Sequence, residues 1–402
     1  MANLYRNPDG TIARRRDGKL MRAPTQQEFE DCCCASPYYP LVWYRYVDPS
    51  MQTYEAVRQD TGATVYSPGN TGAIFPVIKL DRLNRAYYIT SYDGSTQIQV
   101  VYLPNYPPYT SSAGYNIAAG TRPQDLAIGA DHSVYMVGVD DFGLYDKWKV
   151  RRIRQDGSEI WDTGHVFGKR SSYFWPPLVS TDATGNVFLS APPNTYEDTY
   201  SEYDLYKISV DGQLLWSKYI RQVIGYEESL DEFSPISLAV DAAGNAYVSG
   251  DFYKERAGSC ESGIFIVKFS PAGDEVWRVE RTDFIYPGDG RSCRIDVMGD
   301  YIVATGFLKD VGGGYFQVAA GFSSETGQEL WTYETQRYGT YVWVGGGVSI
   351  ADGVAFIVTY SSGGISYRGH LFALDVTNGD LVWETAPRYW SAGNAIAARF
   401  TP

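Results

Sequence analysis

Three histidines and five cysteines are the side chains of this 402-residue sequence best suited to metal binding or nucleophilic catalysis. The histidines, His132, His165 and His370, fall in separate repeats of the chain, which disfavours a shared metal site or a catalytic triad. The patterns G-x-S-x-G, H-E-x-x-H, C-x-x-C and G-x-x-x-x-G-K-[ST] do not occur. We therefore expect no catalytic residue, no metal and no cofactor, although carboxylates are numerous enough to hide a glycosidase or lyase pair.

A repeated phrase places a tryptophan four residues after a glycine. It reads NGDLVWETA, TGQELWTYE, AGDEVWRVE, DGQLLWSKY and DGSEIWDTG, with the tryptophans at Trp383, Trp331, Trp277, Trp216 and Trp161. The glycine suits the positive-φ position of a tight hairpin turn. The tryptophan is expected to fill the space between neighbouring sheets, as part of the core and not of a site.

A second phrase precedes each tryptophan phrase and predicts a strand, a tight turn and another strand. SPISLAVDAAGNAYVSG and PPLVSTDATGNVFLSA are examples, with β-branched and aromatic residues alternating around Asp, Gly or Asn. A third strand such as GIFIVKFS follows before the tryptophan strand. Four antiparallel strands per repeat are typical of a propeller blade.

The spacing of the repeats predicts a seven-bladed β-propeller. Tyr66 and Ala118 are assigned as degenerate tryptophan positions, which gives anchors at 66, 118, 161, 216, 277, 331 and 383. Residues 41–68 supply only three strands, and one spare strand remains at 394–400. We therefore expect this C-terminal strand to complete the first blade and close the ring. The predicted domains are an arm over residues 1–40 and a propeller over residues 41–402.

These phrases resemble the PQQ-like, or quinoprotein-type, propeller repeat, most closely in HLFALDVTNGDLVWETA and AAGFSSETGQELWTYET. DAAGNAYVSGDF is also similar to the β-propeller repeat of bacterial surface proteins. The resemblance covers about residues 41–400 and implies a fold, since such propellers serve as dehydrogenases, scaffolds and adhesion modules. A quinone-dependent dehydrogenase of this superfamily would imply vicinal cysteines inside the ring, a calcium site and an Asp base. The vicinal cysteines of this chain, Cys32, Cys33 and Cys34, precede the first blade, so we expect no quinone cofactor.

Two other cysteines are candidates for a disulfide bond. Cys260 lies in a loop between the second and third strands of one predicted blade, and Cys293 lies where the chain enters the next blade. Both connections emerge at the same end of adjacent blades, so a Cys260–Cys293 bond is expected. The role of the Cys32–Cys34 triplet is left open between packing, disulfides and metal binding.

Charge divides the chain into a basic arm and an acidic body. The net charge is −13, yet residues 1–22 hold six basic residues against two acidic ones, a net charge of +4. The acidic body disfavours nucleic-acid binding, and no apolar run is long enough to span a membrane. The start of the sequence shows no apolar secretory segment. The arm is expected to dock onto a protein assembly partner through Arg14, Arg15, Arg16, Lys19 and Arg22.

Connections at the two ends of the predicted blades differ. At one end the turns are short, for example AAGN and VDG, and at the other end they are long and rich in aromatic and acidic residues. Tyr and Trp are favoured in interfaces, and flat rings suit sugar stacking. We expect a glycan or protein receptor to bind Tyr173, Phe174, Trp175, Tyr226, Tyr286, Tyr338, Tyr341, Trp343, Tyr389 and Trp390.

The function predicted from these features is a non-enzymatic binding or structural propeller. The basic arm, the low lysine content and the absence of a secretion signal favour a virion component, such as a phage tail or capsid accessory protein, in a virion or extracellular location. The alternatives are a bacterial surface or periplasmic scaffold or adhesion propeller, a cytoplasmic scaffold, and a glycan-acting hydrolase or lyase that uses carboxylates of the loop end.

Overall fold

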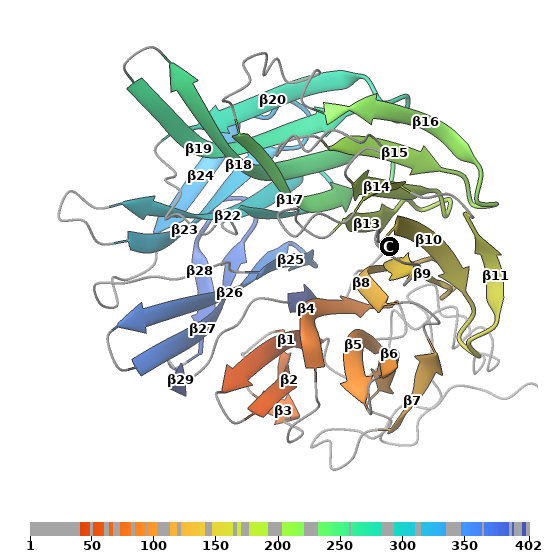
Figure 1. Cartoon of the computed structure of the whole chain (residues 1–402). Coiled ribbons are helices and arrows are strands. Elements are labelled where there is room, and N and C mark those ends of the chain that lie inside the picture. The colour runs from red at the N-terminus through yellow and green to blue at the C-terminus, as the bar shows by residue number, and fades with distance from the viewer. Residues whose placement is uncertain are drawn as a thin grey trace, which may run out of the picture.

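A computed structural model shows β-strands arranged around a centre, and these strands make up most of the residues that the structure describes (Figure 1). The structure describes residues 41–48, 51–59, 64–66, 73–81, 85–92, 95–102, 113–118, 122–140, 147–163, 167–169, 177–191, 203–220, 232–256, 259–282, 293–309, 315–334, 347–363, 366–385, 388–389 and 396–398. None of the described residues belongs to a helix long and apolar enough to cross a membrane. The predicted arm, including its basic residues and Cys32–Cys34, lies outside the described residues.

Six blades are each built from four consecutive antiparallel strands, and we name them A to F. Blade A comprises β4 (Ala73–Leu80), β5 (Ala86–Tyr92), β6 (Ser95–Tyr102) and β7 (Ala113–Ala118). Blade B comprises β8 (Arg122–Ile128), β9 (Val134–Asp140), β10 (Lys147–Ile153) and β11 (Glu159–Asp162). Blade C comprises β13 (Leu178–Thr181), β14 (Val187–Ala191), β15 (Asp204–Ile208) and β16 (Leu214–Tyr219). Blade D comprises β17 (Glu232–Val240), β18 (Ala246–Arg256), β19 (Ser259–Phe269) and β20 (Glu275–Arg281). Blade E comprises β21 (Arg294–Met298), β22 (Tyr301–Lys309), β23 (Tyr315–Ser323) and β24 (Glu329–Glu334). Blade F comprises β25 (Gly347–Ala351), β26 (Val354–Gly363), β27 (Ser366–Asp375) and β28 (Leu381–Glu384).

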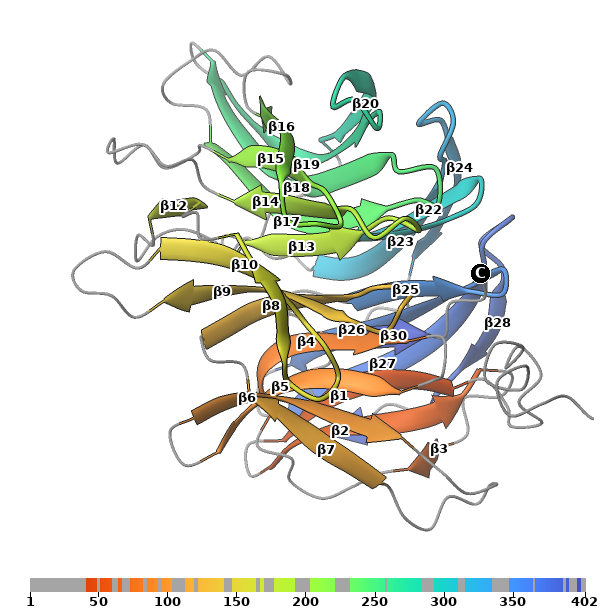
Figure 2. The same ribbon diagram turned by 90° about the vertical axis from the view of Figure 1, so that its right-hand side faces the viewer.

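The first strand of each blade lies toward the centre and the fourth lies at the rim (Figure 1). Neighbouring inner strands contact each other in chain order, from β4 to β8, β13, β17, β21 and β25. Figure 2 shows the same sheets from the side, stacked against one another. Two blades have a fifth strand, because β12 (Phe167–Lys169) pairs with β10 and β29 (Arg388–Tyr389) pairs with β27.

The predicted seven-bladed ring, with its first blade completed by the C-terminal strand, needs correction. Besides the six blades there is one composite sheet, in the order β3-β2-β1-β30, made of β1 (Leu41–Asp48), β2 (Met51–Arg58), β3 (Thr64–Tyr66) and β30 (Ile396–Ala398). β30 contacts β25 and β4, but it pairs with only three of the eight residues of β1. The described C-terminal strand therefore does not complete this sheet as a blade, and the prediction of a seven-bladed ring closed by that strand is wrong, since the structure has six blades.

The repeated tryptophan joins each blade to the next one. The indole N–H of Trp161 donates to the carbonyl of Val210 at 2.8 Å, and that of Trp331 donates to the carbonyl of Val376 at 2.7 Å. Trp216, Trp277 and Trp383 donate in the same way to the carbonyls of Pro271, Ser324 and Gln59. The Gln59 carbonyl belongs to the composite sheet, so Trp383 connects the last blade with the first part of the chain. The prediction that these tryptophans pack between blades is confirmed.

The glycine of the repeated phrase receives the tryptophan of the preceding blade. Gly379 has a φ of 77°, as the sequence predicts for a hairpin turn. A Cβ atom on Gly379 would also lie 2.7 Å from the ring of Trp331. The glycine is thus required twice, for its backbone conformation and for the space that the indole occupies. Gly212, Gly273 and Gly327 stand in the same relation to Trp161, Trp216 and Trp277.

The hydrophobic core is divided into layers between neighbouring sheets. Phe188 and Leu205 of blade C pack with Leu238 and Val248 of blade D. The layer between blade F and the composite sheet joins Phe356 to residues such as Val57. Because both sides of every inner strand pair are covered, strands such as Val187–Ala191 are buried at every position. Each blade is therefore stable only beside its neighbours.

The register of blade A corrects one sequence assignment. Val100 of β6 occupies the position that Arg152 occupies in blade B, since both lie opposite a tyrosine of the second strand. Its partner on the rim strand is Tyr115, whereas Ala118 pairs with Gln97. The position equivalent to the repeated tryptophan is therefore Tyr115 and not Ala118, because Gly114 is paired with Val101 inside β7 and is not the turn glycine that the spacing predicts.

Trp331→Ala is expected to lower the free energy of unfolding by about 3–5 kcal/mol, since it empties a large buried site and leaves the Val376 carbonyl without its indole donor. Trp331 is only 8% exposed, whereas Trp216 is half-buried. Trp216→Ala should therefore cost clearly less, and chemical denaturation of both variants measures the difference. Equal losses would show that burial does not decide the contribution of this repeated contact.

Candidate functional site

The aromatic residues predicted to bind a receptor lie mostly outside the described residues. This holds for Tyr173, Phe174, Trp175, Tyr226, Tyr286, Tyr338, Tyr341, Trp343 and Trp390. Tyr389 belongs to β29, whose backbone pairs with Arg368 of β27. At one end of blades B to F, short turns join the first to the second strand and the third to the fourth strand, for example Thr181 to Val187 and Ile208 to Leu214. Most of the long connections predicted at the other end lie outside the described residues, and two connections there are short, from Arg256 to Ser259 and from Gly363 to Ser366. We call the end with the short turns the turn face and the opposite end the loop face.

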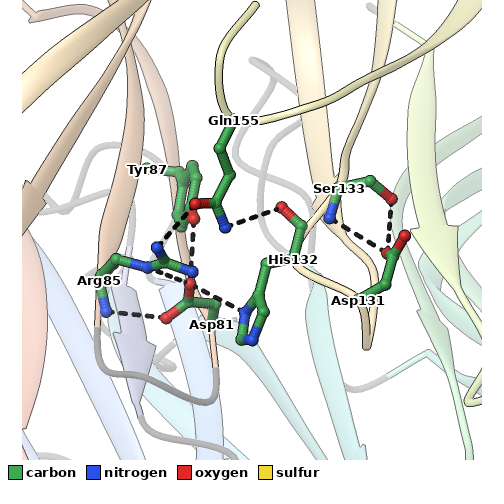
Figure 3. Close-up of polar contacts among 7 residues, drawn as sticks. All are labelled: Asp81, Arg85, Tyr87, Asp131, His132, Ser133 and Gln155. Atoms are coloured by element: carbon green, nitrogen blue, oxygen red, sulfur yellow. Dashed lines mark hydrogen bonds and ion pairs between the residues drawn. The ribbon is translucent and has the colours of Figure 1, made fainter. Parts of the chain in front are cut away.

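The described turn face carries a polar network between blades A and B (Figure 3). Asp81, whose side chain is 1% exposed, follows β4 and accepts hydrogen bonds from the backbone N–H and the guanidinium of Arg85 at 2.9 and 2.6 Å. The hydroxyl of Tyr87 donates to the same carboxylate at 3.0 Å, and Nδ1 of His132 lies 3.2 Å from it. Gln155 accepts from Arg85 at 2.8 Å, and its amide N lies 3.5 Å from the carbonyl of His132.

The sequence forms this network because Asp at the end of an inner strand stabilises the turn that follows it. Asp182 and Asp241 hold equivalent turns by accepting from the backbone and side-chain amides of Asn186 and Asn245. Blade A has Arg85 where those blades have asparagine, and its side chain is long enough to reach blade B. His132 adds a contact from the neighbouring turn, at a φ of 63° that is uncommon for a residue other than glycine.

Asp81 is a buried carboxylate whose negative charge is stabilised by the hydrogen bonds and positive charge around it. Burial alone would raise its pKa, but the hydrogen bond to His132 and the charge of Arg85 outweigh burial and hold the pKa below the ordinary value. The carboxylate therefore remains ionised at neutral pH. A catalytic acid or base near neutrality needs the opposite shift, so this network is suited to joining two blades.

Two further carboxylates lie on inner strands, near the centre of the ring. Asp125 of β8 accepts from Leu126 N at 2.9 Å and from Val179 N of blade C at 2.8 Å. Asp296 of β21 accepts from Val297 N at 2.9 Å and from Ile350 N of blade F at 2.7 Å. Burial raises the pKa of both carboxyl groups, and the hydrogen bonds and nearby positive charges only partly oppose it. Each aspartate thus bridges two blades.

Sequence reasoning missed a set of cations that support the tryptophans. Lys207 and Lys268 donate to the carbonyls of Pro271 and Ser324, which also accept the indoles of Trp216 and Trp277. Arg152 does the same at the Val210 carbonyl. The three cations stack on Phe188, Tyr247 and Tyr135. The signal was a basic residue in the third strand, opposite the tryptophan in the observed register.

The predicted disulfide between Cys260 and Cys293 is wrong. Cys293 is a free, fully buried thiol whose pKa is raised by burial. Its carbonyl accepts a hydrogen bond from Ser249, and Ser249 pairs with Ile266 of β19. Cys260 lies on β19 six residues before Ile266, about 20 Å away at about 3.3 Å per residue. The long β18–β19 hairpin, which extends outward in Figure 1, therefore carries Cys260 far beyond the roughly 7 Å between Cα atoms that a disulfide allows.

The described histidines do not meet. His132 lies in the turn between the first two strands of blade B, and His370 is buried inside β27 of blade F. His165 lies outside the described residues. Within the described ranges, no group of three or more His, Cys, Asp or Glu side chains is placed to hold a metal ion.

Comparisons with known proteins give the fold and no closer relationship. No protein-family model matches the sequence, and no curated protein matches it. A hypothetical selenium-binding protein from Sulfolobus tokodaii is similar in structure with a TM-score of 0.56 and 9% identity, over 90% of this chain and 94% of that chain. A Lactobacillus plantarum protein gives 0.54 at 13% identity (89% and 99%), and a putative 6-phosphogluconolactonase from Bacteroides fragilis gives 0.53 at 11% (90% and 99%). The all-β propeller is thus shown, whereas membership of the PQQ-like family is not.

Asp81→Asn is expected to lower the free energy of unfolding by about 2 kcal/mol at neutral pH, because the buried partners of the carboxylate lose a charged acceptor. A depressed folded-state pKa stabilises the fold above the unfolded value of about 3.9 and is lost as pH falls through the folded value. The difference between variant and wild type should therefore shrink below about pH 4. Asp274→Asn, at an exposed ion pair with Lys218, is the control and should have little effect. An Asp81→Asn variant with the same free energy of unfolding as the wild type at pH 7 would contradict this role.

Cys293 is expected to resist alkylation in the folded protein, because the thiol is buried and its raised pKa disfavours the reactive thiolate. Peptide mapping by mass spectrometry after iodoacetamide treatment, with and without denaturant, measures this. The peptide should be modified only in denaturant. Rapid modification under native conditions would show that the D–E boundary opens.

Proposed function

We propose that this protein is a non-enzymatic binding or scaffold propeller that recognises a glycan or protein through its loop face. The observation that carries the proposal is that five charged or titratable side chains of the described residues make contacts between blades. Asp81, Arg85 and His132 on the turn face, and Asp125 and Asp296 near the centre, are all engaged in contacts between blades. These groups stabilise a rigid ring, which leaves recognition to the long connections of the other face.

The composition of those connections supports the choice of the loop face. They contain Trp175, Trp343 and Trp390, none of which is in the register of the repeated tryptophan. Rigid aromatic side chains give a large contact area at a small loss of conformational entropy. The rigid sheets behind them limit the further cost of ordering the interface.

The alternative function is that of a glycan-acting hydrolase or lyase with a carboxylate pair on the loop face. Three of the described carboxylates, those of Asp81, Asp125 and Asp296, are engaged in contacts between blades and so do not favour it. The narrower role as a virion component, docked through the basic arm, gains no support from the fold or from the comparisons. It remains a prediction from the sequence.

Replacing Trp175, Trp343 or Trp390 by alanine is expected to weaken binding at least tenfold without changing the melting temperature, if these rings contact the ligand. A glycan array and cross-linking to proteins of the source organism identify the ligand, and titration measures the variants. Trp331→Ala is the matched control, since it should lower the melting temperature. Equal destabilisation by loop and core variants would show that the loop aromatics only cover the ring.

The same preparation separates binding from catalysis. Incubation with the bound glycan should release neither reducing ends nor unsaturated products. Release of either product, abolished by a loop-face carboxylate substitution, would establish the enzyme instead.

A further inference from the structure

The rim strands carry every large hydrophobic side chain that is exposed among the described residues. These side chains are Leu214, Leu215, Val276, Leu330, Leu381 and Val382, on β16, β20, β24 and β28. Each of these strands comes last in the order of its sheet. Exposed apolar side chains that gather on one part of a surface, bordered by polar groups, mark interaction sites.

A β-bulge presents one of these side chains on each of the four rim strands. In blade E, Trp331 pairs with Gly321 and Glu329 pairs with Phe322, so Leu330 has no partner residue across the strands. Val382 of blade F stands in the same position. Leu330 is 45% exposed and Val382 is 51% exposed. A bulge at a sheet edge opposes pairing with a further strand, so these positions are suited to contacts made by side chains.

The rim of blades E and F is acidic as well as apolar. Residues 324–334 and 376–385, which we call the E–F rim, contain neither lysine nor arginine. The two segments lie side by side, because Trp331 covers Gly379. Their exposed acidic side chains are Glu325, Glu329, Glu334, Asp380 and Glu384.

Most of this negative charge is not compensated. Glu329 forms an ion pair with Arg281 of blade D. Among the described residues, no basic side chain lies at ion-pair distance from the other four carboxylates. The rims of blades C and D differ, since their phrases include the basic residues Lys218 and Arg278. The E–F rim therefore fits a partner that is both basic and apolar.

The basic arm of the same chain has this complementary composition. Residues 1–22 have a net charge of +4. Their second half, IARRRDGKLMR over residues 12–22, combines five basic residues with Ile12, Leu20 and Met21. The rest of the chain is acidic, so the rim of a second copy would repel the E–F rim.

The place where the described chain begins favours the arm of the same molecule. Leu41 opens β1, and the composite sheet that contains β1 packs against blade F. Trp383 of the E–F rim donates to the Gln59 carbonyl of that sheet. Residues 23–40 join the basic segment to this point and can span at most about 60 Å. Binding within one chain also needs no encounter with a second molecule.

We propose that the E–F rim is the docking surface for the basic arm of the same chain, with residues 12–22 as the bound segment. The arginine and lysine side chains pair with the exposed carboxylates, and the apolar side chains of the arm cover Leu330, Leu381 and Val382. Exposed ion pairs are individually weak, so several act together and the arm is readily displaced. This surface is separate from the loop face and does not depend on the function proposed for it. Docking of the arm onto another protein then requires its release from the E–F rim.

The rate at which trypsin cleaves the full-length protein at Arg14–Arg16 measures how much of the arm is unbound. A triple variant removes charge from the E–F rim and should speed this cleavage about fivefold or more; its substitutions are Glu325→Gln, Glu334→Gln and Glu384→Gln. The matched control removes the same charge from exposed positions of blades B, C and D and should cleave like the wild type; its substitutions are Asp156→Asn, Asp211→Asn and Asp274→Asn.

The apolar contact is tested in the same way. Val382→Thr keeps the size of the side chain and should also speed cleavage of the arm. Val276→Thr is the matched control, since Val276 occupies the equivalent bulge of blade D and is equally exposed. It should leave the cleavage rate unchanged.

Cross-linking with a carbodiimide identifies the molecule to which the bound arm belongs. Lys19 is the only lysine of residues 1–40, so an amide bond from Lys19 to Glu325, Glu334 or Glu384 reports the contact. In a mixture of isotope-labelled and unlabelled protein, both linked peptides should carry the same label.

Linked peptides of mixed label would overturn the proposal and assign the E–F rim to the arm of a second copy. Equal cleavage rates for the wild type and the E–F triple variant would also overturn it, as would equal acceleration by the matched control. If the triple variant has a lower melting temperature than the wild type, the valine pair decides. Equal cleavage rates for Val382→Thr and Val276→Thr then contradict the proposal.

Discussion

The contact of a rim-strand tryptophan with the next sheet is the interaction on which this ring depends. Four of the indoles cover a turn glycine of the neighbouring blade and donate to a carbonyl close to that glycine, as Trp331 does to Gly379 and Val376. A radial arrangement of sheets widens toward the rim, so a large planar side chain is needed there more than at the centre. The donor also satisfies a turn carbonyl that would otherwise be partly desolvated. One residue type thus supplies both volume and hydrogen bonding.

The boundaries between blades vary around this common contact. At three of them a basic residue of the third strand shares the acceptor carbonyl with the tryptophan, for example Lys268 beside Trp277. In blade E that position is Gly321, where a Cβ would lie 2.2 Å from Trp331, so the indole enters the space and becomes the most buried of the set. In blade A the equivalent position in the register is Tyr115, and the turns of Asp81 and His132 meet at the A–B boundary. The boundaries therefore share the tryptophan contact only in part and differ in the side chains that accompany it.

The placement of the charged groups at contacts between blades has a consequence for function. The charged groups of Asp81, Arg85 and His132 on the turn face, and of Asp125 and Asp296 near the centre, make contacts between sheets, so changes there are expected to alter stability first. Loops held by a rigid scaffold are where binding residues concentrate. A propeller of this kind can change its ligand by changing its connections, which is why similar folds at about 10% identity carry no activity over.

The sequence by itself determined the strand pattern, the antiparallel repeat, the turn glycines and the identity of the tryptophans as core residues, because these follow from local periodicity and turn chemistry. It did not determine the contacts between sheets. The Cys260–Cys293 bond was predicted from the shared end of two blades, yet the length of the β18–β19 hairpin separates them. The pairing of Tyr115 instead of Ala118, the cations beside the tryptophans and the bridges of Asp125 and Asp296 likewise depend on register and on which strands become neighbours. The cation contacts and the aspartate bridges join residues 54 to 64 positions apart, and only the assembled ring brings them within hydrogen-bonding distance.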